Sequence, residues 1–123
     1  MYKDTDITMS IQKLLCGQRP VVSMLLVAPL HLDILNAVKQ ASTVAFCEKK
    51  TGCQSCANCM LLQHGHHPDL YLIEPEDASS SIKIDRIREI QQHIYQTPKR
   101  GLRKIVILNQ AEKMNISASN ALL

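Results

Sequence analysis

Hydrophobic residues along the chain occur in short continuous runs and, before and after these runs, at the spacing of an amphipathic helix. Residues 21–28 and 104–108 are apolar runs of strand length with several β-branched residues. Such runs are typical of strands covered on both faces in a parallel sheet. A third run, residues 69–74, ends at Pro75, and a proline cannot donate to a strand ladder. These runs predict three strands.

Five further segments show helical periodicity. Apolar side chains recur at helical spacing before the first run, in residues 7–15, and again in residues 30–46. A short helix is predicted around residues 60–62, ending at Gly65. The predicted face of the first helix is Ile7, Ile11, Leu14 and Leu15, and that of the second is Leu32, Leu35, Val38, Lys39, Ser42 and Phe46. Asp85 is predicted to cap a further helix whose face is Ile87, Ile90 and Ile94. Asn115 or Ser117 is predicted to cap a last helix.

Strands that alternate with helices predict an α/β fold with a mainly parallel sheet. A chain of 123 residues provides one domain or less, and its 46% hydrophobic content is enough for a core. Aromatic residues are only 3% of the chain, so this core must be aliphatic. The last predicted helix has barely begun where the sequence stops, which predicts a C-terminally truncated fragment of a longer protein.

The ends and the charge of the chain add limits on its location and partners. Residues 1–6 are polar and do not resemble a signal peptide, and no apolar run approaches the ~20 residues of a membrane span. We therefore expect a cytoplasmic, soluble protein without a membrane partner. The net charge is +3, with a basic stretch at residues 99–104. That stretch is interpreted as a solvated face, because no aromatic residues interleave with it, and contact with DNA is the alternative.

Four of the five cysteines lie within thirteen positions, at Cys47, Cys53, Cys56 and Cys59. A structural zinc ion takes four thiolates in a tetrahedron, and short spacings bring them together. Disulfides are disfavoured in a reducing compartment, which leaves unliganded thiols as the alternative. Cys16 is expected to be a packed thiol in the first helix rather than a fifth ligand.

Three histidines follow the cysteine cluster and are the competing ligands. Any of His64, His66 and His67 could replace a sulfur atom. Because four sulfurs already satisfy a structural metal, these histidines are interpreted as surface groups or as partners of the ligands. A metal-binding module is thus expected at about residues 47–67.

The connection after the first predicted strand lacks the features of a phosphate-binding loop. Such a loop uses glycines, a lysine and a Ser or Thr hydroxyl, whereas residues 28–33 contain none of these. Asn109 stands after the last predicted strand, where an aspartate would hold magnesium, and it is neutral. We therefore expect no catalytic residues, no ATP binding and no intrinsic catalysis.

With these features in place, the chain from Val21 to Leu123 resembles the N-terminal AAA+ (P-loop NTPase-like) domain of bacterial DNA polymerase III clamp-loader subunits. The stretches that carry the resemblance are the four-cysteine cluster, His67-Pro68-Asp69, Ile87-Arg88-Glu89, Lys104–Leu108, Ala111–Met114 and Asn120–Leu123. The resemblance implies that residues 1–123 are part of an AAA+ domain with an inserted zinc module. In this family four cysteines bind zinc, which carries over to Cys47, Cys53, Cys56 and Cys59.

The resemblance also implies a function. A member without a phosphate loop resembles the stator-like subunit of the ring, not the ATP-hydrolysing gamma/tau subunit. The implied partners are gamma/tau and delta, and indirectly the sliding clamp and primed DNA, with the arginine finger lying outside this chain. Two alternatives stay open: an AAA+ ATPase with an aberrant phosphate loop, and a zinc-ribbon module that binds nucleic acid through residues 99–104.

Overall fold

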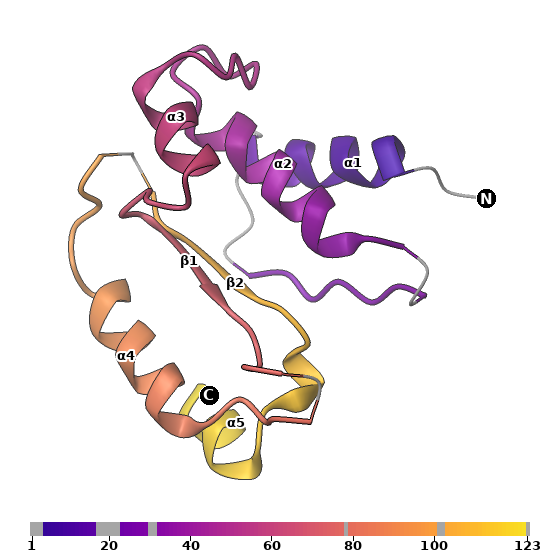
Figure 1. The fold of residues 1–123 in the computed structure, drawn as a ribbon, viewed down its shortest axis with the longest axis vertical. Coiled ribbons are helices and arrows are strands. Elements are labelled where there is room, and N and C mark those ends of the chain that lie inside the picture. The colour runs from indigo at the N-terminus through magenta and orange to yellow at the C-terminus, as the bar shows by residue number, and fades with distance from the viewer. Residues whose placement is uncertain (1–3, 17–22, 30–31, 78, 101–102, 123) are drawn as a thin grey trace. The chain divides into compact units, whose positions relative to one another are not determined.

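The computed structural model describes residues 4–16, 23–29, 32–77, 79–100 and 103–122 (Figure 1). The chain divides into two compact units, Met1–His67 and Pro68–Leu123. The first unit carries the cysteine cluster, and the second carries the sheet. The predicted α/β class with parallel pairing is confirmed in the second unit.

The first unit is built on helices α1 (Asp4–Cys16), α2 (Ile34–Phe46) and α3 (Ala57–Gln63). Helices α1 and α2 pack together through Ile11, Ala37 and Ala41, which are at most 3% exposed. Ile7 and Leu15 complete this contact as predicted. Leu14 was predicted to share that face, but it is 42% exposed, because its position turns it toward the edge of the stripe.

Helix α2 begins later than predicted and confirms only part of the predicted face, since Ser42 and Phe46 are buried and Val38 packs against the contact with α1. The expected start at residue 30 is wrong, since the helix starts at Ile34, where the Asp33 side chain accepts a hydrogen bond from the Asn36 amide at 3.1 Å. Its buried residues are Ala37, Ala41, Ser42, Ala45 and Phe46. Small alanine side chains let α1 approach α2 closely. A sequence pattern based on large apolar residues does not reveal these alanines.

The first predicted strand, residues 21–28, is wrong in the part that the structure describes. Residues 23–29 form neither a helix nor a strand, and Leu25 and Val27 are 80% and 87% exposed. Residues 21 and 22 lie outside the described residues. The apolar run predicted a strand buried between helices. A strand also needs a neighbouring strand to which it is hydrogen-bonded, and the structure shows no such neighbour for residues 23–29.

The second unit contains two parallel strands, β1 (Leu70–Ile73) and β2 (Ile105–Leu108), in the register Leu70 to Ile105 through Ile73 to Leu108. Both strands were predicted. Helix α4 (Ile84–Ile94) connects them, and η1 (Ala111–Lys113) and α5 (Ile116–Leu122) follow (Figure 1). The core of this unit consists of Ile73, Ile82, Ile87, Ile90 and Ala118.

The ends of the helices in this unit test the predicted caps. Asp85 was predicted to cap α4 but lies inside its first turn, and Lys83 is the cap residue. A carboxylate in the first turn stabilises the helix dipole without a capping bond. Asn115 was predicted correctly, since its Oδ1 accepts from the Ala118 amide at 2.8 Å. No helix in the described ranges has the length and apolarity to cross a membrane.

Candidate metal centre

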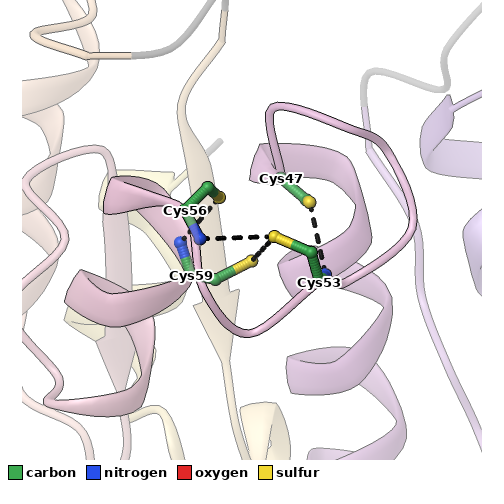
Figure 2. Close-up of side chains that lie close together, drawn as sticks. All are labelled: Cys47, Cys53, Cys56 and Cys59. Atoms are coloured by element: carbon green, nitrogen blue, oxygen red, sulfur yellow. Dashed lines mark hydrogen bonds between the residues drawn. The ribbon is translucent and has the colours of Figure 1, made fainter.

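The four predicted cysteines come from the end of α2, the loop after it and the start of α3 (Figure 2). Their ligand sulfur atoms all lie within 4.8 Å of one another, and the Sγ atoms of Cys53 and Cys59 are 4.0 Å apart. A tetrahedron with Zn–S bonds of ~2.3 Å has edges of ~3.8 Å. The donor set therefore fits one tetrahedral ion such as zinc.

The loop between α2 and α3 reverses sharply to bring these sulfurs together. Lys50, Gly52 and Gln54 all have positive φ angles, of 59°, 71° and 63°. Left-handed residues at alternate positions fold the chain back over a short distance, and glycine adopts this conformation without steric penalty. Lys50 also donates from its ammonium to the Ala45 carbonyl at 2.8 Å, which ties the loop to the end of α2.

Backbone amides point at three of the sulfur atoms. The Cys53 amide lies 3.4 Å from Cys47 Sγ, the Cys56 amide 3.3 Å from Cys53 Sγ, and the Cys59 amide 3.4 Å from Cys56 Sγ (Figure 2). The last of these bonds makes Cys56 the cap residue of α3. Amide donors favour the charged form of a sulfur, which is the form that binds metal.

Two thiols are easily ionised in this environment. The Cys53 amide is the largest cause that lowers the pKa of Cys47 to about 5. Hydrogen bonding from the Ser55 side chain is the largest cause that lowers the pKa of Cys53 to about 7. At neutral pH the site therefore already holds negative charge, which attracts a cation.

Cys59 behaves in the opposite way, because burial raises the pKa of its thiol to about 12. Its exposed fraction is 0%. A buried thiol beside other sulfurs resists ionisation unless a positive charge arrives with it, and a bound metal ion deprotonates such a thiol outright. The burial of Cys59 thus suits a ligand of an enclosed metal site.

The fifth cysteine and the neighbouring histidines lie outside this group. Cys16 is exposed in α1, so the prediction that it is packed is wrong. His64 and His66 are exposed, whereas His67 is only 5% exposed. Among the described residues, the group able to hold a metal consists of the four cysteines alone. That these cysteines bind zinc stays a prediction.

Sequence reasoning missed Asn58, which lies between two of the cysteines and is 7% exposed. Its Nδ2 donates to the Phe46 carbonyl at 2.9 Å, and its Oδ1 lies 3.2 Å from His67 Nε2. An asparagine inside a cysteine cluster is ordinarily read as a solvent-facing residue. The position of His67, close after α3, was the available signal for a buried polar partner.

Asn109 follows β2 as predicted, and its environment is now visible. Its Nδ2 donates to Glu74 Oε2 at 3.3 Å, so it presents an amide donor at the carboxyl end of the sheet. In the connection at residues 28–33, residues 30 and 31 lie outside the described part of the chain.

Comparison with known proteins places these features in a family. Residues 3–123 match the family described as DNA polymerase III, delta subunit. The DNA polymerase III subunit delta' of Pseudomonas aeruginosa is 45% identical over 71 residues, which are 58% of this chain and 22% of that protein. The proteins of the same name from Yersinia pestis and Escherichia coli are 36% and 32% identical over 80 and 85 residues.

The last two matches cover 63% and 67% of this chain, and 24% and 25% of the relatives. The chain thus spans about a quarter of the length of the curated relatives that it matches.

Proposed function

Because the chain belongs to the DNA polymerase III delta subunit family, we propose that it is part of a delta-prime subunit that acts in the bacterial clamp loader without hydrolysing ATP. The family match over residues 3–123 is the observation that carries this proposal. The resemblance to delta-prime subunits, seen in the sequence alone, is confirmed by the relatives of that name. In this role the chain contributes an AAA+ domain to the subunit ring through protein contacts.

The residues at the nucleotide-binding position support a subunit without ATPase activity. Residues 28–33 contain no glycine and no lysine to surround a phosphate. Asn109 uses its amide to donate to Glu74, so the position that would carry a magnesium-binding carboxylate offers a donor instead. Equilibrium binding of labelled ATP to this chain should give no saturable signal, with a gamma/tau subunit as positive control. Saturable, magnesium-dependent binding would instead favour the ATPase with an aberrant loop.

We further propose that Cys47, Cys53, Cys56 and Cys59 hold a structural zinc ion. The proximity of the four sulfurs and the amides that face three of them support this assignment. Because four protein sulfurs fill a tetrahedron, no position would remain for a substrate, as in structural sites. The zinc would tie the end of α2 to the start of α3. Elemental analysis of protein purified without added metal should give one zinc per chain, and no metal would refute the assignment.

The clamp-loader role is tested through partners. Immobilised chain should retain gamma/tau or delta subunits of the same organism, or both, at low salt. A chain whose four cysteines are replaced by serine is the matched control for contacts that depend on the metal-bound fold. Failure of the wild-type chain to retain either subunit would count against an assembly role for residues 1–123.

One observation favours a second candidate function, nucleic-acid binding by the basic turn. Lys99 and Arg100 are exposed in a turn whose backbone is fixed by Asp69. Lys104, in contrast, donates to the His93 carbonyl and so serves the end of α4. A gel-shift titration with primed DNA distinguishes the two functions. Binding without partner subunits that weakens steeply with salt would support the nucleic-acid binder.

A further inference from the structure

Beside the cysteine cluster lies a buried polar group that contains no cysteine. It consists of Phe46, Asn58 and His67, which are called here the Asn58 latch. The exposed fractions of Asn58 and His67 are 7% and 5%, and that of Phe46 is 4%. Buried amides and imidazoles are kept in place only where their polar atoms are paired.

The pairing within the latch is directional. The Phe46 carbonyl can only accept, so the Asn58 atom that faces it at 2.9 Å must be the Nδ2 donor. The Asn58 Oδ1 then faces His67 Nε2 at 3.2 Å, which requires a proton on that nitrogen. The His67 ring also stacks on the Phe46 ring, with centroids 4.4 Å apart and a tilt of 33°. His67 Nε2 is therefore a donor to Asn58 and is not offered to a metal.

The latch joins the two helices that carry cysteine ligands. Phe46 is the last residue of α2 and precedes Cys47, whereas Asn58 lies in α3 next to Cys59. The bond from Asn58 to Phe46 spans twelve positions, so it closes the whole loop that contains Cys53 and Cys56. It also satisfies a carbonyl at the end of α2, which has no partner within the helix. These contacts use no sulfur atom and need no metal ion.

We propose that the Asn58 latch holds Cys47 and Cys59 at ligand spacing before the metal arrives, and thereby sets the affinity of the site. This inference rests on the proposed zinc site and makes Asn58 and His67 positioning residues rather than ligands. Without the bond from Asn58 to Phe46 nothing in the latch closes the loop between them, so an unlatched loop would open without metal. Closing it again would reduce the net affinity.

The test compares zinc affinities of the 123-residue chain and its variants by competition with a chromophoric chelator. Asn58→Ala removes both hydrogen bonds, and His67→Phe keeps a ring against Phe46 but loses the donor. His67→Gln keeps an N–H donor without the ring and serves as the conservative variant. If Asn58→Ala does not fold, the comparison of His67→Phe with His67→Gln still tests the latch. Control variants are Asn115→Ala, which removes the cap of α5 in the other unit, and the exposed His66→Phe.

We expect Asn58→Ala and His67→Phe to bind zinc about 10–100-fold more weakly, which is the usual effect of losing a residue that orients metal ligands. His67→Gln should regain much of that loss, and both controls should bind as the wild type does. The thiolate-to-metal and ligand-field bands of the Co²⁺-loaded variants should match those of the wild type, because no ligand is changed.

Three results would overturn the latch. Wild-type affinity in both Asn58→Ala and His67→Phe would show that the contacts do not position the ligands. An equal loss in Asn115→Ala would reduce the effect to general destabilisation, and an altered Co²⁺ spectrum in His67→Phe would make His67 a ligand. A wild-type chain that binds no zinc would refute the proposed metal site itself, and the wild-type titration shows this before any variant is compared.

Discussion

The buried carboxylate of Asp69 allows the sharpest test of the second unit. Asp69 is 0% exposed, and its two oxygens accept from the Lys99 amide at 2.7 Å and the Arg100 amide at 2.8 Å. These bonds span about thirty positions and fix the turn that leads into β2. Asp69→Asn keeps the size of the side chain but replaces one acceptor oxygen with an NH₂ group. One backbone amide would then face a donor.

The expected loss follows from these two bonds. A hydrogen bond to a charged group stabilises a protein by about 1.5–3 kcal/mol, and an unsatisfied buried donor adds a penalty of about 1–3 kcal/mol. Because Lys99 and Arg100 are exposed, water reaches part of the turn, and this lowers the penalty for the unsatisfied donor. We therefore expect Asp69→Asn to reduce the free energy of unfolding by about 2–4 kcal/mol. Domains have only about 5–15 kcal/mol in total, so this loss is large.

Urea unfolding followed by tyrosine fluorescence measures this loss, because Tyr71 and Tyr95 both lie in the second unit. With an m-value of about 1–2 kcal/mol/M, the midpoint should fall by roughly 1–4 M. The matched control is Asp77→Asn, since Asp77 also accepts from a backbone amide, that of Ser79 at 2.9 Å, but is exposed. A midpoint for Asp69→Asn equal to that of Asp77→Asn would refute the reasoning.

Three further changes test the first unit. Cys56→Ser removes a proposed zinc ligand but leaves a hydroxyl that can still cap α3. The zinc-loaded melting temperature should therefore fall well below that of the exposed-site control Cys16→Ser, and equal melting curves would contradict a structural metal. Zinc affinity should fall on acidification, more steeply below pH 7 than above it. Cys59, with its raised pKa, must release a proton to bind the metal at every pH from 6 to 8, whereas Cys53, whose pKa is about 7, must release one only below pH 7. A chelator competition at pH 6, 7 and 8 that gave the same zinc dissociation constant each time would exclude this pH dependence. Ala41→Leu should lower the free energy of unfolding by about 1–3 kcal/mol in thermal or urea melts, because Ala41 is 0% exposed where α1 meets α2; an unchanged stability would mean that the helix contact can expand.

Features coded by neighbouring residues were predictable from the sequence. The positions of β1 and β2 followed from apolar runs bounded by turn residues, and the cap at Asn115 followed from its side-chain chemistry. The end of α3 at Gln63, just before Gly65, was also predictable, because a glycine readily adopts the left-handed conformation that follows a helix end, and Gly65 has a φ of 71°. In each case the decisive contacts lie within a few positions.

Two of the wrong predictions, the first strand and the buried face of α2, concern features that depend on distant partners. Residues 21–28 have the composition of a buried strand, but composition does not name the neighbour that accepts its hydrogen bonds. The buried face of α2 consists mostly of alanines, which carry little hydrophobic signal of their own. Their burial depends on α1, and periodicity within α2 alone does not reveal which side α1 will cover.

The candidate metal centre contains both kinds of information. Its four cysteines span only thirteen positions, and a loop with left-handed residues brings them together, so their spacing alone was enough to propose the ligands. Asn58 and His67 are nine positions apart, and their role depends on which side of α3 packs against the end of α2. Neither residue type is unusual on a protein surface, so only the fold identifies them as buried. The proposed metal type thus rests on local spacing, whereas the strength of binding is expected to depend on tertiary contacts that bring the ligands into position.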